Sequence, residues 1–146
     1  MPSDLVFLDS GGWIALLNER DENHPQATTV WGQIVKRRPT VITTSWVIAE
    51  TGNGLSATPV RVKFARAVRF LLTRPDYRVI EVDRGLLEKA TDLYASRLDK
   101  TWGLVDCASF VVMEELNISE AFTTDHDFTQ AGFQRLIPRP RGSNGR

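Results

Sequence analysis

The chain has 146 residues, 42% of them apolar, and its 18 basic and 18 acidic residues give a formal net charge of zero. This length and apolar share fit one domain with a closed core, and the balanced charge gives no general attraction to nucleic acid. A single cysteine excludes an internal disulfide, and no apolar run approaches the roughly 18 residues that a membrane-spanning helix needs. We therefore expect a soluble, cytoplasmic protein without a membrane partner, whose function depends on where particular residues lie.

The first predicted element is an apolar strand that ends in an acid. Val6, Phe7 and Leu8 lead directly into Asp9, Ser10 and two glycines, a pattern typical of a buried parallel strand that ends at a crevice. A short amphipathic helix over 12–19 follows, and a second helix over 24–38 begins with a proline in its first turn.

The next segment pairs a strand with a helix that carries an acid. Residues 40–44 are mostly β-branched and predict a strand, and Ser45 is a suitable N-cap for a helix over 46–51. Glu50 shares a side of that helix with Trp46 and Val47 by its three- and four-residue spacing. A carboxylate on an apolar face needs a partner. We expect a loop from Gly52 onward.

A basic helix and two further elements follow. The helix predicted over 60–73 places Lys63, Arg66 and Arg69 at three-residue steps. This basic face is either a solvated surface or a phosphate-contacting one, and the pattern does not decide between them. A strand is predicted over 77–82, and Asp83 is expected to cap a helix that runs to about residue 99.

The last part of the domain contains the remaining acids. Residues 103–113 are apolar nearly all round, which predicts a buried helix, and Asp106 in its first turn is the acid hardest to explain without a metal. A strand over 118–124 ends in Asp125 and Asp127, and a short strand over 133–137 follows. We expect a domain over 1–137 and a flexible tail over 138–146.

Alternating strands and helices predict a three-layer α/β/α sandwich with a mostly parallel sheet of four or five strands. Ligands of such sheets gather at the carboxyl ends of the strands, so four acids are expected to converge there: Asp9, Glu50, Asp106 and Asp125. Neighbouring carboxylates resist joint ionisation, and a hard divalent cation such as Mg²⁺ or Mn²⁺ resolves the conflict. Such an ion activates water and stabilises a phosphoryl transition state, which is nuclease chemistry.

Simpler interpretations exist for several of these residues. Asp9 and Asp125 could each cap the helix that follows, and Asp127 could cap the turn after it. His126 is more often a solvent-facing neighbour of such acids than a general base. Aspartyl phosphotransfer with Asp9 as nucleophile is disfavoured, because that chemistry wants a second acid two residues on, where this chain has Gly11.

Four motifs, in a fixed order along the chain, are typical of one protein family. They are an apolar strand ending in Leu8-Asp9-Ser10, an Ala49-Glu50 pair on a helix, a Trp-x-Leu-x-Asp-Cys helix start over 102–107, and a Thr-x-Asp-x-x-Phe segment over 123–128. Over residues 5–137 the chain resembles the PIN-domain ribonucleases, most closely the VapC-type toxins of bacterial toxin–antitoxin pairs. At Gly103 and Val105 it lacks a hydroxyl residue that relatives often carry.

The resemblance implies roles for particular residues. Asp9, Glu50 and Asp106 correspond to the three metal-binding acids of the family, Asp125 to a more variable fourth, and Asp127 could join through water. It also implies an Mg²⁺- or Mn²⁺-dependent endoribonuclease that leaves 5′-phosphate and 3′-hydroxyl ends, a homodimer, and a small antitoxin as inhibitor.

Ser10 is expected to orient an acid or the scissile phosphate, and Lys63, Arg66 and Arg69 to contact RNA or a protein partner. The alternative is a catalytically silent PIN-like module that binds RNA or an antitoxin. A silent module would have no reason to keep all four acids.

Overall fold

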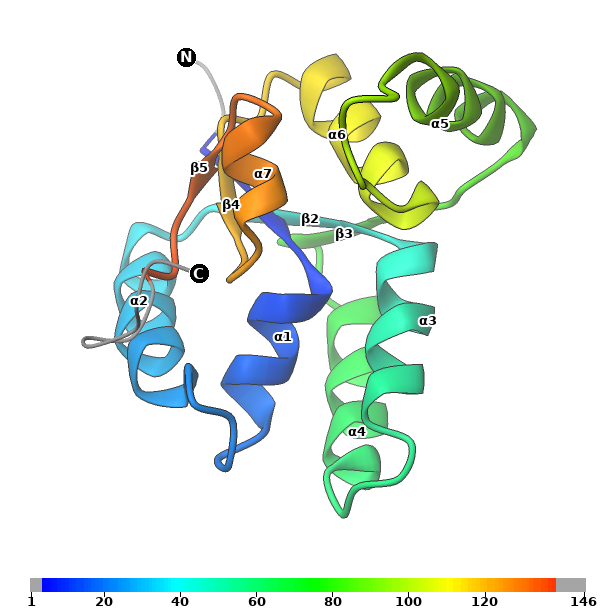
Figure 1. Ribbon diagram of the computed structural model, residues 1–146. Helices are drawn as coiled ribbons and strands as arrows, with labels where there is room; N and C mark the ends of the chain where they lie inside the picture. The colour runs from blue at the N-terminus through cyan, green and yellow to red at the C-terminus, as the bar shows by residue number, and fades with distance from the viewer. Residues whose placement is uncertain (1–3, 139–146) are drawn as a thin grey trace.

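The computed structural model describes residues 4–138, which build a five-stranded sheet covered by helices on both faces (Figure 1). The strand order is β3-β2-β1-β4-β5, and every neighbouring pair is parallel. The strands are β1 (Leu5–Leu8), β2 (Thr40–Thr44), β3 (Tyr77–Ile80), β4 (Glu120–Phe122) and β5 (Gln134–Arg135). The predicted parallel sheet is confirmed, and all five of these strands belong to it.

Two groups of helices cover the two faces of the sheet. They are α1 (Ser10–Leu17), α2 (His24–Arg37), α3 (Ser45–Gly54), α4 (Arg61–Leu72), α5 (Arg84–Ser96), α6 (Leu104–Glu115) and α7 (His126–Gln130). Side chains alternate along β1, so Val6 and Leu8 enter the core with α1, α2 and α4, whereas Phe7 enters the core with α5, α6 and α7. The predicted three-layer sandwich is therefore confirmed (Figure 1).

Helix α3 differs from its predicted limits at both ends. Thr44, not Ser45, is its N-cap: Thr44 Oγ1 accepts a hydrogen bond from Val47 N at 3.1 Å. The Ser45 hydroxyl instead accepts one from Val82 N in the connection before α5. The helix also continues through Gly52, where a loop was expected. Glycine has no side chain, so α3 packs closely against α4 at this point: a Cβ at Gly52 would lie 3.1 Å from the Phe64 ring.

Several other elements are shifted or shorter than the sequence pattern predicts. Ladder pairing in β4 covers only Glu120–Phe122 and in β5 only Gln134–Arg135, although Ile118 and Ile137 are buried beside them. The apolar pattern of the sequence indicates which residues are buried, and the buried residues extend beyond those that share ladder hydrogen bonds. Helix α5 ends at Ser96, before the expected limit near 99.

Most of the predicted tail over 138–146 cannot be compared with the structure. Of those residues only Pro138 is described, and the rest lie outside the described range, as do residues 1–3. Within residues 4–138, no helix is both long enough and apolar enough to cross a membrane.

The order of the strands fixes where a ligand site can form. The chain leaves the central strand β1 toward β2 and β3, and then crosses back to add β4 and β5 on the other side. The connections that follow β1 and β4 therefore diverge at the carboxyl ends of these neighbouring strands, which is where open α/β sheets bind ligands.

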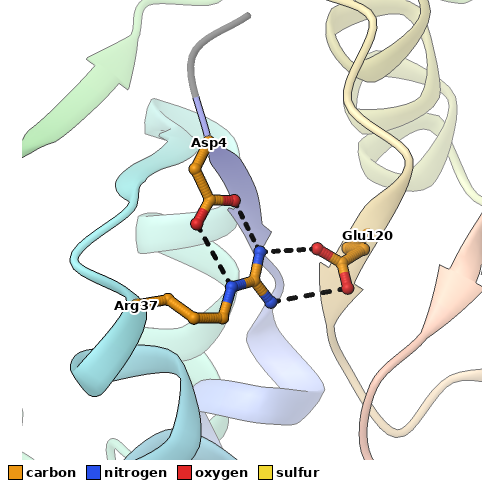
Figure 2. Close-up of polar contacts among 3 residues, drawn as sticks. All are labelled: Asp4, Arg37 and Glu120. Carbon is orange, nitrogen blue, oxygen red and sulfur yellow. Dashed lines mark hydrogen bonds and ion pairs between the residues drawn. The ribbon is translucent and has the colours of Figure 1, made fainter.

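At the opposite, amino end of the sheet, one arginine ties three elements together (Figure 2). Arg37, at the end of α2, donates to Asp4 just before β1 and to Glu120 at the start of β4, with a 2.7 Å bond to Glu120 Oε1. These two carboxylates raise the pKa of Arg37 above its usual range. At this end, a cation from the protein itself therefore pairs with both carboxylates.

Candidate active site

Asp9 leaves the carboxyl end of β1 and turns into the interior. Its backbone N donates to Phe122 O at the end of β4 (3.2 Å), and its Oδ2 accepts a hydrogen bond from Thr123 Oγ1 (2.7 Å). Asp9 occupies the N-cap position of α1, as the capping interpretation expects, but its side chain makes no capping hydrogen bond there. Asp9 is only 2% exposed, and its Oδ1 accepts no hydrogen bond from the described residues.

The two glycines after Ser10 allow α1 to begin directly against β4. A Cβ at Gly12 would lie 2.1 Å from Phe122 O, and one at Gly11 would lie 2.7 Å from Thr124 Oγ1. Only glycine permits an approach this close, because the first of these contacts is to backbone that cannot move aside. The glycines therefore bring Asp9 and the end of β4 into one site.

Glu50 reaches the site from α3. Ser10 Oγ donates to Glu50 Oε1 at 2.6 Å, which joins the start of α1 to the middle of α3. The expectation that Glu50 lies on an apolar face was wrong: Val47 is fully buried, whereas Glu50 is exposed. Of the two roles expected for Ser10, the structure thus contains the hydrogen bond to an acid.

Three further carboxylates meet at the start of α6 and α7. One oxygen from each of Asp106, Asp125 and Asp127 lies within 4.8 Å of the other two. Asp106 Oδ2 accepts a hydrogen bond from Gly103 N at 3.1 Å. Asp125 Oδ1 accepts from Asp127 N at 2.9 Å. Asp125 is therefore the cap of α7, and the expected capping role of Asp127 is wrong.

Burial and repulsion from neighbouring carboxylates raise the pKa values of Asp9, Asp106 and Asp127. Burial raises the pKa of Asp9 to about 7, the Thr123 hydrogen bond opposes the rise, and the charges of Asp106 and Glu50 add to it. The pKa of Asp106 is raised to about 6, again by burial first and by the charges of Asp125, Glu50 and Asp127. Burial and Asp125 also raise the pKa of Asp127. The five acids form one electrostatically coupled group, which we call the acid cluster.

The acid with the least contact with water is Asp9, not Asp106. Asp9 is 2% exposed, whereas Asp106 is only partly buried. The sequence pattern located the apolar helix around Asp106 correctly, but it did not reveal that the first residues of α6, Leu104–Asp106, are only partly buried. Of these two acids, Asp9 therefore has the greater need of a positively charged partner.

Within the described part of the chain, the acid cluster lacks a matching cation. Among residues 4–138, no ion pair joins any of its five acids to a lysine or arginine. Lys100 and His126 are close enough only to lower the pKa of Asp127 slightly against the larger raising effects. Oxygen-only donors, a buried carboxylate oxygen without a donor and unmatched negative charge together fit a hard divalent cation.

The basic face predicted on α4 lies away from the acid cluster. Lys63, Arg66 and Arg69 are exposed, and Lys63 Nζ donates to Leu17 O at 3.2 Å. Leu17 ends α1, one helix length of about 12 Å from Ser10. A surface groove of about 460 Å³ lies at this end of α1 and includes Lys63. The structure does not bring these three residues into contact with the acids.

Comparison with known proteins agrees with this arrangement. The family model for the PIN domain matches residues 6–134. The chain belongs to the PIN-domain family. This PIN domain is 30% identical over 134 residues to the 23S rRNA-specific endonuclease VapC20 of two Mycobacterium tuberculosis strains, CDC 1551 and H37Rv, covering 92% of this chain and 99% of the relative.

A solved structure extends the similarity to three dimensions. The crystal structure of Mycobacterium tuberculosis VapC20, described as a sarcin-ricin loop cleaving toxin, matches this PIN domain with a TM-score of 0.80 at 29% identity. The match covers 91% of this chain and 99% of VapC20. The resemblance to VapC-type toxins inferred from the four motifs is confirmed.

One residue of the site was not assigned a role from the sequence. Thr123 is fully buried and contacts both Asp9 and the backbone of Asp125. The Thr-x-Asp-x-x-Phe motif includes it, but its contact with Asp9 spans 114 residues of sequence. Only the parallel pairing of β1 with β4 brings the two together.

Proposed function

We propose that this protein is a divalent-metal-dependent endoribonuclease that acts as the toxin of a toxin–antitoxin pair. The observation that carries the proposal is the acid cluster, in which a buried carboxylate oxygen and several mutually repelling acids have no matching cation among residues 4–138. Membership of the PIN-domain family and similarity to a named RNA endonuclease support the same function.

Five residues would hold the ion or ions: Asp9, Glu50, Asp106 and Asp125 directly and Asp127 through water. A bound Mg²⁺ or Mn²⁺ would lower the pKa of a water and neutralise the charge that develops on the phosphate. Two of these carboxylates are oriented by hydrogen bonds from the protein: Ser10 Oγ donates to Glu50, and Gly103 N donates to Asp106. The water-derived oxygen would remain on phosphorus, giving 5′-phosphate and 3′-hydroxyl products.

The basic face of α4 is a candidate surface for RNA, although it lies away from the acid cluster. We propose that the exposed face of Lys63, Arg66 and Arg69 contacts RNA phosphates outside the cleaved bond, since none of the three is ion-paired among residues 4–138. Replacing all three with Gln should raise the KM for RNA and flatten its salt dependence. An unchanged KM with weakened antitoxin binding would assign the face to the protein partner instead.

We further propose that the protein forms a homodimer and is inhibited by a small antitoxin that covers the acid cluster. Light scattering of the purified protein would give its mass in solution, and a monomer at micromolar concentration would contradict the dimer. Protection of RNA on adding the co-encoded antitoxin, if one adjoins the gene, tests the inhibition.

The deciding experiment is cleavage of structured RNA by the purified protein with Mg²⁺ or Mn²⁺. We would use a sarcin-ricin hairpin first, because the named relative acts on that loop, followed by a panel of unrelated hairpins. EDTA should abolish cleavage, as should Asp9→Asn and Asp106→Asn. Cleavage that survives both would contradict the metal-acid site, and no cleavage of any RNA by folded protein would favour the silent binding module.

A further inference from the structure

Thr123 occupies a position from which one hydroxyl acts on two acids. Its Oγ1 donates to Oδ2 of Asp9 at 2.7 Å and accepts a hydrogen bond from Asp125 N at 3.0 Å. The side chain is fully buried, so water does not compete for either bond. Because a hydroxyl has a single proton, the donor to Asp9 and the acceptor for Asp125 are assigned without ambiguity.

The consequence is that the two oxygens of Asp9 are not equivalent. Oδ2 is held by Thr123, whereas Oδ1 is buried and accepts no hydrogen bond from the described residues. The backbone around Asp9 is also held in place: Asp9 N donates to Phe122 O, and the preceding carbonyl, Leu8 O, accepts from Thr43 Oγ1 at 2.8 Å. Whichever oxygen of Asp9 accepts the Thr123 hydrogen bond, only the other is left for a ligand.

We propose that Thr123 is a positioning residue that makes Asp9 a one-oxygen ligand and thereby favours Mg²⁺ or Mn²⁺ over Ca²⁺. This inference rests on the proposed function, because it requires a divalent cation at the acid cluster. Ca²⁺ takes six to eight oxygen ligands and readily binds both oxygens of one carboxylate, whereas Mg²⁺ demands six ligands in near-octahedral order. Holding one oxygen of Asp9 removes the two-oxygen mode that suits Ca²⁺.

The link from Thr123 to Asp125 strengthens the same effect. Asp125 N is fixed on the hydroxyl that fixes Asp9, so the relative position of two acids from β1 and β4 depends on one group. A rigid pair of ligands discriminates between ions of different size better than a flexible pair. The outer partner of a metal ligand typically changes metal affinity by 10–100-fold when removed.

Thr123→Val tests the proposal, because valine keeps the shape of threonine and removes only the hydroxyl. Mn²⁺ and Ca²⁺ affinities would be measured on the free protein by calorimetry, without RNA. We expect Mn²⁺ to bind about 10–100-fold more weakly, and Ca²⁺ to change much less, so that the preference for Mn²⁺ shrinks. Thr123→Ser keeps the hydroxyl and should restore the preference.

Thr51→Val is the matched control. Thr51 is equally buried, but its hydroxyl donates to the Val47 carbonyl at 2.7 Å instead of to a carboxylate. It should leave the ratio of the two affinities unchanged. If Thr123→Val does not fold, Thr123→Ala removes the same hydroxyl without placing a methyl group against the Asp9 carboxylate.

Two results would overturn the proposal, and they are distinguishable. If the parent protein binds Mn²⁺ and Thr123→Val keeps the same affinity ratio, whether both affinities are unchanged or both fall equally, then Thr123 does not select the ion, and the proposed function stands. If the parent protein binds no divalent cation, the metal-dependent function fails together with the role of Thr123.

Discussion

The two ends of the parallel sheet hold acidic side chains under opposite conditions. At the amino end, Asp4 and Glu120 share the guanidinium of Arg37, and all three are partly open to water (Figure 2). At the carboxyl end, the acid cluster includes Asp9, which is 2% exposed, and no lysine or arginine of residues 4–138 forms an ion pair with it.

The difference separates acids that stabilise the fold from acids that the fold holds in place at a cost in stability. The amino-end carboxylates join three elements and need nothing further. At the carboxyl end, Asp9 and Asp106 cost folding free energy when charged, since burial and repulsion raise their pKa values. Such a cost is typical of a binding site, where a ligand supplies the missing charge.

The largest expected effect is on catalysis. Asp9→Asn keeps the shape of the side chain and an acceptor for Thr123, but removes the charge at the buried oxygen. We expect cleavage of structured RNA to fall by more than about 100-fold, beyond the range typical for loss of an outer partner of a metal ligand. Initial rates at saturating Mg²⁺ would measure the change. Asp4→Asn, at the amino end, is the control and should cleave at the parent rate.

Gly12→Ala should be the most destabilising of the small substitutions. Its Cβ would lie 2.1 Å from Phe122 O, so α1 must move away from β4. We expect a loss of about 3 kcal/mol in the free energy of unfolding, the upper end for an overpacked site. Gly32→Ala on α2 is the control, because nothing lies within 4 Å of its Cβ, and it should stabilise by up to about 1 kcal/mol. Equal effects in urea unfolding would contradict the close approach.

The sequence was sufficient for the parts of the site that depend on local pattern. Asp9 and Asp125 were placed correctly because each follows a buried strand, and strands of a parallel sheet end at one edge. The burial of α6 was also predictable from its apolar sequence. These features need only the order of residues within one element.

Features that depend on pairing between distant elements could not be predicted. The hydroxyl of Thr123 on Asp9 requires β1 and β4 to be neighbours, which periodicity does not state. The exposure of Glu50 depends on which side of α3 packs against the rest of the domain, and its spacing from Trp46 and Val47 suggested the wrong side. The contacts of Arg37 with Asp4 and Glu120, which we call the Arg37 clamp, join residues from three elements. Charge clusters of this kind have no sequence signature.

Stability of the metal-free protein should depend on pH through Asp9. Its pKa is raised from 3.8 to about 7 in the folded state, so the folded protein holds a proton that the unfolded chain releases. The stabilising contribution of the protonated form is complete below pH 3.8, declines as pH rises, and is lost above about 7. We expect the free energy of unfolding to fall by on the order of 4 kcal/mol between these limits.

Urea unfolding in EDTA, followed by tryptophan fluorescence, would measure this pH dependence. Asp9→Asn has no proton to lose and should show a flatter profile, with higher stability than the parent at pH 8. Asp106→Asn should flatten the profile only up to about pH 6, the value to which the pKa of Asp106 is raised. Identical profiles for the parent and Asp9→Asn would exclude a coupled, buried Asp9.

The smallest expected effect belongs to the amino end. Arg37→Met removes the clamp but leaves Asp4 and Glu120 in contact with water, so we expect a loss of only about 1 kcal/mol. Thermal unfolding would measure this loss. Higher salt should lower the stability of the parent protein and leave the stability of the variant unchanged. RNA cleavage by this variant should match the parent. A loss of activity without loss of stability would show that the two ends of the sheet are coupled.

Binding of Mn²⁺ to the free protein, followed by electron paramagnetic resonance, tests most directly whether the acid cluster is a metal site. The parent protein and Arg37→Met should bind Mn²⁺ with the same affinity, and Asp9→Asn and Asp106→Asn should each lose most of it. Unchanged binding in the Asp9→Asn, Asp106→Asn double variant, or no binding by the parent protein, would contradict a metal site at the carboxyl end of the sheet.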